Sequence, residues 1–144
     1  AGEADGAESV ECALNFQAKR IGHGIRCIEN PLVMQELADR GVVLELCPTS
    51  NLNTKIYETI GDYPIQQLMN KGIRVTVNTD NMMVSDTTEA RELALVADIF
   101  NMEKKDVKQL IMNGVEAAFA TEVIKNRLRA RVETQFAKVA GIRG

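Results

Sequence analysis

Short apolar runs alternate along this chain with longer stretches in which apolar residues recur at helical spacing. Three of these runs, over residues 20–23, 42–51 and 75–80, end on polar residues that include His23, Asn51 and Asp80. An apolar run followed by a helical segment is typical of a strand–helix unit with a parallel sheet. Because parallel strands end at one edge of a sheet, the pattern predicts that these polar residues gather there.

Capping residues delimit the helices between the runs. Asn30 and Pro31 are a good helix start, and Gly41 predicts a left-handed cap at the end of that helix. Apolar spacing predicts an earlier helix over 7–19, and a shorter helix begins near 62 and ends at Gly72. Two polar segments are predicted to be loops, namely 48–61 and 79–86.

Beyond residue 100 the alternation of strands and helices stops. A helix capped by Thr87 or Thr88 precedes two long amphipathic stretches over 101–118 and 121–140. We therefore expect a single domain over 1–144, with strand–helix units over about 1–100 and terminal helices over 101–144. A closed parallel barrel needs eight strands and ~250 residues, so three strands make about half of one.

Composition narrows the classes of partner. The net charge is −3 and no stretch approaches the ~20 apolar residues that span a bilayer, which disfavours nucleic-acid and membrane binding. The three cysteines, Cys12, Cys27 and Cys47, form no C-x-x-C pair, which disfavours a metal site built on them. We predict buried, reduced thiols and a cytoplasmic location.

Four short motifs carry a resemblance to a known family. They are Ala1-Gly-Glu3, Arg20-Ile-Gly-His-Gly24, Glu45-Leu-Cys-Pro-Thr-Ser-Asn51 and Val77-Asn-Thr-Asp-Asn81. In order and spacing the chain resembles the C-terminal half of the adenosine deaminase family. That resemblance implies an α/β fold, half of a (β/α)8 TIM barrel with terminal helices, and a parent enzyme with one Zn²⁺ at the carboxyl ends of the strands.

The resemblance also implies roles for four residues. Glu3 matches the general acid that protonates the purine ring at N1, and His23 matches the histidine that orients the attacking hydroxide and stabilises its charge. Asp80 matches a carboxylate ligand of zinc. Asn81 stands where many members have an aspartate that contacts the purine, so this position is expected to bind substrate. Taken without the family, His23 is a structural residue, Asp80 caps a turn and Glu3 is a solvated charge.

The departures from the family pattern predict an incomplete site. His23 is the only histidine, so the histidine ligands of the family's zinc are absent from this chain. Because a zinc site needs three or four protein ligands, Asp80 alone should not hold the metal tightly. We expect the C-terminal half of a longer enzyme, inactive without the N-terminal half of its barrel.

The reaction expected of that parent is the hydrolysis of adenosine to inosine and ammonia. Thr49 favours adenosine, because relatives that act on free adenine tend to carry leucine there; an adenine deaminase of the same family is the alternative. A third possibility is a non-catalytic half-barrel module that associates with a second copy of itself, since an open sheet leaves an edge strand unpaired.

Overall fold

The fold centres on a three-stranded parallel sheet in the computed structural model, which describes residues 1–139. The strands are β1 (Arg20–Gly22), β2 (Val43–Leu46) and β3 (Arg74–Val77), in the order β1-β2-β3. Ile21 pairs with Leu44, and Leu44 pairs with Val75. The α/β class and the parallel sheet predicted from the apolar runs are confirmed.

Helices that cover the sheet follow the capping signals closely. They are α1 (Ala7–Asn15), the 3₁₀ helix η1 (Ile25–Glu29), α2 (Pro31–Arg40) and α4 (Ile65–Asn70). The Asn30 side chain accepts a hydrogen bond from the Leu32 N–H, and Gly41 is left-handed at φ 60°, as predicted. Helix α1 ends four residues earlier than predicted, because the chain turns through a positive φ at Gln17.

The two segments predicted to be loops contain helices. Residues 48–61 include α3 (Pro48–Asn53) and the start of η2 (Ile60–Asp62), and residues 79–86 include α5 (Met82–Ser85), before α6 (Glu89–Ile99). The loop predictions were wrong there because such short helices are too brief to show apolar periodicity. Pro48, whose fixed φ suits the first turn, and the Asn81 cap were the available signals.

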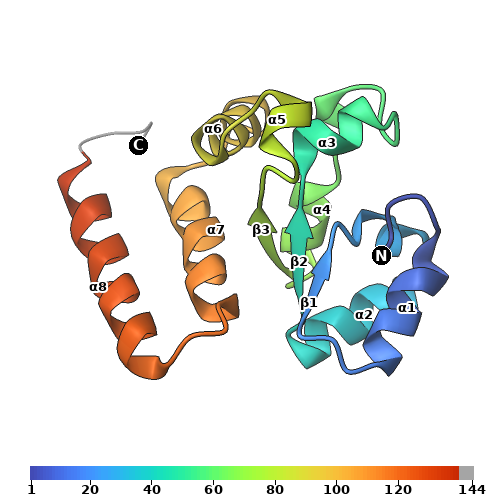
Figure 1. Cartoon of the computed structure of the whole chain (residues 1–144), viewed down its shortest axis with the longest axis horizontal. Coiled ribbons are helices and arrows are strands. Elements are labelled where there is room, and N and C mark those ends of the chain that lie inside the picture. The colour runs from blue at the N-terminus through green and yellow to red at the C-terminus, as the bar shows by residue number, and fades with distance from the viewer. Residues whose placement is uncertain (140–144) are drawn as a thin grey trace.

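Two long helices, α7 (Lys104–Ala117) and α8 (Glu122–Lys138), stand side by side at the end of the molecule opposite α1 and α2 (Figure 1). Helix α7 packs along β3, whereas α8 packs on α7 and contains no buried residue. The predicted apolar stripe of α8 is therefore only partly covered. Of the predicted terminal region 101–144, residues 140–144 lie outside the described part of the chain.

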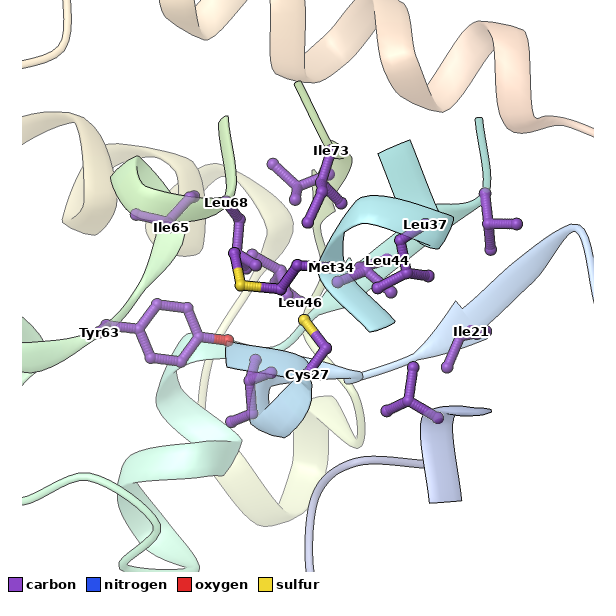
Figure 2. Close-up of a cluster of buried hydrophobic side chains, with 14 of the residues drawn as sticks. Ile21, Cys27, Met34, Leu37, Leu44, Leu46, Tyr63, Ile65, Leu68 and Ile73 are labelled. Atoms are coloured by element: carbon purple, nitrogen blue, oxygen red, sulfur yellow. The ribbon is translucent and has the colours of Figure 1, made fainter. Parts of the chain in front are cut away.

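One apolar core joins the sheet to its helices, as Figure 2 shows for part of it. Leu44, Leu46 and Val75 of the strands are fully buried, together with Leu37 of α2 and Leu68 of α4. At ~25 cal/mol per Å² of apolar surface, this burial is the main force that holds the strand–helix units together. Within residues 1–139, no helix has the length and apolar character needed to cross a bilayer.

The cysteines differ from one another in their surroundings. Cys27 and Cys47 are buried as predicted, but Cys12 is exposed, so the prediction of three buried thiols was wrong at that position. Cys12 lies on α1, whose buried face is formed by Ala7, Val10 and Leu14. All three cysteines are free thiols.

Candidate active site

The carboxyl ends of the three strands point toward the rim of the molecule that holds α3, α5 and α6 (Figure 1). His23 follows β1, the Pro48–Asn53 helix α3 follows β2, and Asp80 follows β3. The predicted site residues from the strand ends therefore share one edge of the sheet. His23 and Asp80 both have positive φ, at 61° and 56°, an uncommon backbone conformation that is enriched at functional positions.

The N-terminal segment reaches this rim by lying against the loop after β1. The Gly24 N–H donates to the Ala1 carbonyl at 2.8 Å, and the Arg26 N–H donates to the Gly2 carbonyl at 3.1 Å. A Cβ on Gly2 would lie 2.9 Å from the Gly24 Cα, so the two backbones can approach this closely only because residue 2 is glycine. This close approach places Glu3 beside His23.

Glu3 and His23 belong to a hydrogen-bonded group that also contains Asn51 and Tyr63, here called the glutamate–histidine cluster. The Asn51 amide nitrogen lies 3.1 Å from Glu3 Oε1 and 3.1 Å from His23 Nδ1. The Tyr63 hydroxyl donates to Asn51 Oδ1 at 2.9 Å, and His23 Nε2 lies 3.4 Å from Glu3 Oε2. The Asn51 side chain thus connects two residues that the motifs had singled out separately.

Asp80 bonds to Ser50, the residue that precedes Asn51 in helix α3. The Ser50 hydroxyl donates to Asp80 Oδ2 at 2.8 Å, and Ser50 is buried while Asp80 is exposed. Because Ser50 and Asn51 are consecutive in α3, this helix contacts both the glutamate–histidine cluster and Asp80. Helix α3 is therefore the element that fixes the predicted site residues relative to one another.

A buried carboxylate anchors the loops that carry these residues. Glu92 of α6 is fully buried and accepts hydrogen bonds from the Thr49 N–H at 3.0 Å and the Thr87 hydroxyl at 2.6 Å. Thr49 belongs to α3, and Thr87 follows α5. Through these two hydrogen bonds Glu92 ties the segments after β2 and β3 to α6.

Burial sets the protonation of two groups at the rim. It raises the pKa of the Cys47 thiol to about 12, with a smaller contribution from the nearby carboxylates of Asp80 and Glu3. Burial also raises the pKa of the Tyr63 phenol well above its ordinary value. Both groups are therefore uncharged near neutral pH, so Cys47 is unsuited to be a nucleophile and Tyr63 keeps the proton that it donates to Asn51.

Asn81, the predicted substrate-binding residue, lies at the exposed start of α5. Its Oδ1 accepts hydrogen bonds from the N–H groups of Met83 and Val84, both at 3.1 Å. The carbonyl end of this amide thus caps α5, and its NH₂ group remains for a ligand. Met82 and Met83 are 56% and 91% exposed, so neither packs beneath the loop.

The described residues supply few ligands for a metal. Over residues 1–139 there is no group of three or more histidine, cysteine, aspartate or glutamate side chains placed to hold one ion. The Asp80 carboxylate, with Oδ2 bound by Ser50, offers one ligand. These residues therefore do not make a complete zinc site by themselves.

Two open pockets adjoin this region. One, of about 420 Å³, lies beside Glu3 and is lined by Arg26, Glu29, Ile56 and Tyr57 among others. A second, of about 410 Å³, lies between the sheet and α7, and its lining contains none of the four predicted site residues. Of these two pockets, the first is the one lined by a predicted site residue, Glu3.

Sequence reasoning missed four residues that build the site. Asn51 and Ser50 were not predicted to be site residues, yet their side chains bind the predicted site residues. Tyr63 and Glu92 were not considered at all. Their roles depend on contacts between segments 12 and 43 positions apart, which no local pattern reports. The family motif that contains Ser50 and Asn51 was the only signal for any of them.

Comparison with protein families gives a match over most of the chain. The model of the family described as adenosine deaminase matches residues 1–135. A curated adenosine deaminase of Haemophilus ducreyi is 44% identical over 94% of this chain and 40% of its own length. A curated adenine deaminase of Chelativorans is 42% identical over 92% of this chain and 41% of its own length. The chain thus spans about two fifths of these relatives.

Solved structures share the fold. An adenine deaminase from Arthrobacter aurescens superposes with a TM-score of 0.91 at 28% identity, over 96% of this chain and 42% of the other. An amidohydrolase from Burkholderia ambifaria with bound zinc superposes with a TM-score of 0.85 at 25% identity, over 95% of this chain and 39% of the other. The fold is accordingly part of a deaminase barrel, as the resemblance to the adenosine deaminase family implied.

Proposed function

Because the chain belongs to the adenosine deaminase family, we propose that it contributes the acid, a charge-stabilising histidine and one metal ligand to a hydrolytic purine deaminase. The observation that carries this proposal is the glutamate–histidine cluster. Glu3 and His23 are 20 positions apart in the sequence, yet Asn51 bonds to both at the carboxyl edge of the sheet. This is the edge at which parallel α/β enzymes place their reactive groups.

Glu3 is proposed to be the general acid. Its carboxyl group lies beside the open pocket at the rim and is partly shielded from water, with 28% of the side chain exposed. A carboxyl that gives a proton to a ring nitrogen of a purine makes the adjacent carbon a better electrophile for attack by water. Asn51 holds one carboxylate oxygen, which fixes the direction in which the other can act.

His23 is proposed to orient the attacking oxygen and to stabilise the charge that develops there. Its ring is 17% exposed and held by Asn51, so it is placed in advance of the reaction. Asp80 is proposed to be a carboxylate ligand of zinc, which would lower the pKa of a bound water in the complete enzyme. Asn81 is proposed to contact the substrate through its free NH₂ group.

The chain is proposed to act as part of a longer protein. It spans about 40% of the curated adenosine deaminase, and its described residues provide one carboxylate where zinc needs three or four ligands. The Burkholderia relative with bound zinc supports the same choice of metal for the whole enzyme. We expect the chain alone to bind zinc weakly and to leave adenosine unchanged; the cytoplasmic location also stays a prediction.

Adenosine is the proposed substrate, and free adenine is the alternative. Two curated relatives of nearly equal identity bear these two names, so overall similarity does not separate them. Thr49 favours adenosine, and its N–H is bound to Glu92 at the rim. Comparing the turnover of adenosine and adenine by the complete enzyme, with and without Thr49→Leu, decides between the two substrates.

The roles can be tested in a protein that joins this chain to the missing half of the barrel. Asp80→Ala should abolish the retention of zinc, measured as bound metal after dialysis. Glu3→Gln should keep the zinc but lose most of the turnover of adenosine to inosine. Glu11→Gln is the matched control, because Glu11 lies exposed on α1 and its substitution should change neither quantity. Near-normal turnover by Glu3→Gln would disprove the assignment of the acid.

A non-catalytic module that pairs with a second copy is the competing proposal. Strand β3 lies at one edge of the sheet, although Asn113 of α7 donates to the Val75 carbonyl there at 2.8 Å. Size-exclusion chromatography with light scattering on the isolated chain tests this. A dimer at micromolar concentration would support self-association, and a monomer would count against it.

A further inference from the structure

Asn51 makes more contacts with the site than any other side chain of the glutamate–histidine cluster. It is fully buried, so bulk solvent does not reach its polar atoms. Its NH₂ group faces Glu3 Oε1 and His23 Nδ1, each at 3.1 Å, and its Oδ1 accepts from the Tyr63 hydroxyl at 2.9 Å. An asparagine amide has two N–H donors, and two side-chain atoms lie within hydrogen-bond distance of its nitrogen.

The direction of this amide is set by its neighbours. Glu3 Oε1 accepts a hydrogen bond from the NH₂ end of Asn51, and the Tyr63 hydroxyl donates to its Oδ1. The reversed amide would place Oδ1 against Glu3 Oε1, so the hydrogen bond to Glu3 would be lost. The Tyr63 phenol keeps its proton because burial raises its pKa, and it supplies the donor that the Asn51 carbonyl needs.

From this geometry we infer that Asn51, aligned by Tyr63, is a positioning residue that fixes the tautomer of His23. Because an N–H of Asn51 points at Nδ1, that nitrogen must offer its lone pair and the ring proton must be on Nε2. Nε2 lies 3.4 Å from Glu3 Oε2, so the N–H is presented to the side of the site where Glu3 lies. The use of the His23 Nε2–H donor in catalysis rests on the proposed function. The assignment of the tautomer does not depend on that function.

The tautomer can be measured directly in the chain as it stands. His23 is the only histidine in the sequence, so the two ring nitrogens of a ¹⁵N-labelled chain without an affinity tag need no assignment against other histidines. Long-range ¹H–¹⁵N correlation distinguishes a nitrogen that bears a proton from one that does not. We expect the proton on Nε2 in the native chain near neutral pH, and a proton on Nδ1 would overturn the inference.

A free histidine also prefers Nε2–H, so this tautomer in the native chain does not by itself show that Asn51 fixes it. A pair of substitutions separates the two causes. Combining Asn51→Asp with Glu3→Gln keeps the net charge and exchanges donor and acceptor between the two positions. The new carboxylate can accept from Tyr63, from the new amide and from Nδ1–H. We therefore expect the population of Nδ1–H relative to Nε2–H to rise roughly tenfold, which is the effect of one hydrogen bond. A folded double variant that keeps Nε2–H would overturn the inference.

Tyr63→Phe tests the alignment of Asn51 without changing any charge. It removes the donor to Asn51 Oδ1, so the His23 nitrogen shifts should move toward a mixture of tautomers. Tyr57→Phe is the matched control. The ring centroids of Tyr57 and Tyr63 lie 5.4 Å apart, but the Tyr57 hydroxyl lies outside the glutamate–histidine cluster. If Tyr63→Phe leaves the His23 nitrogen shifts unchanged, the role of Tyr63 is refuted.

These measurements use no substrate and no metal. A chain that shows the predicted tautomers but belongs to an enzyme with another reaction would refute the proposed function alone. A working deaminase whose His23 carries its proton on Nδ1 would refute this inference alone. The two failures are therefore distinguishable.

Discussion

The rim of the sheet and the C-terminal helix α8 are held in place in different ways. At the rim, segments far apart in the sequence meet through hydrogen bonds to fully buried side chains, as when Asn51 bonds to Glu3 or Glu92 bonds to Thr49. Helix α8 has no buried residue and is bound to α7 by ion pairs such as Arg129 with Glu116 at 2.6 Å. Both regions are rich in polar contacts, but only at the rim do fully buried side chains take part in them.

The difference teaches which polar contacts determine structure. A buried polar group that loses its partner cannot bond to water instead, whereas the charges of a broken ion pair at the surface become hydrated. We therefore expect the rim to respond strongly to single substitutions and α8 to respond weakly. It also follows that the positions of the candidate catalytic groups depend on the buried residues that bond to them, such as Asn51.

Among the single substitutions, the largest effect is expected at Glu92. Glu92→Ala leaves the Thr49 N–H and the Thr87 hydroxyl without an acceptor and opens a cavity, so the free energy of unfolding should fall by about 3 kcal/mol. Urea unfolding followed by circular dichroism measures this. Glu89→Ala is the control, because Glu89 lies exposed in the first turn of the same helix. Equal losses for the two variants would contradict the contrast between buried and exposed carboxylates.

The next effect is expected where the N-terminal segment meets the loop after β1. Gly24 has φ +70°, and a Cβ there would lie 2.6 Å from Leu44 Cδ2. Gly24→Ala should therefore lower the free energy of unfolding by about 2 kcal/mol, from backbone strain and from contact with a buried side chain. Gly72→Ala separates the two causes, since Gly72 has φ +76° but nothing within 4 Å of its added Cβ. It should show the strain alone, about 1 kcal/mol.

The sequence was most informative where local rules decide the structure. The Asn30 cap, the Gly41 cap and the three apolar runs were confirmed because each depends on a few neighbouring residues. The motif around His23 and that around Asp80 correctly placed both at one edge of the sheet, since parallel strands end together. Their proposed roles remain predictions.

The parts that sequence reasoning missed depend on contacts between distant segments. Asn51 bonds to Glu3 across 48 positions, and neither residue carries a pattern that names the other. Helix α3 was taken for a loop because its buried residues, Pro48, Ser50 and Asn51, are mostly polar, so hydrophobic periodicity could not show it. The positioning residues of a site are thus harder to predict than its reactive residues.

Alkaline pH should weaken the buried part of the molecule. Burial raises the pKa of Cys27 and of Cys47 from 9.0 to about 12, so the folded chain keeps protons that the unfolded chain releases. This contribution to stability is complete below pH about 9 and is lost as the pH rises from there toward about 12, at about 1.4 kcal/mol per pH unit for each thiol. Urea unfolding at stepped pH measures the slope.

Two cysteine variants sharpen that measurement. Cys27→Ala should reduce the alkaline slope, because one of the two buried thiols no longer titrates. Cys12→Ala should leave the slope unchanged, since Cys12 is exposed in the folded chain as well. An unchanged slope in Cys27→Ala would show that this thiol ionises as easily in the folded chain as in the unfolded one.

The smallest effect is expected at the ion pairs of α8. Arg129 contacts Glu116 and Glu122 at the surface, and its guanidinium pKa is raised chiefly by the hydrogen bond to Glu116. Arg129→Gln should nevertheless leave the urea midpoint of the chain unchanged, because water solvates the separated charges nearly as well as they solvate each other. Added salt should have equally little effect on the native chain. A clear loss of stability in Arg129→Gln would mean that α8 shares the cooperative core, and the contrast between the two regions would then be wrong.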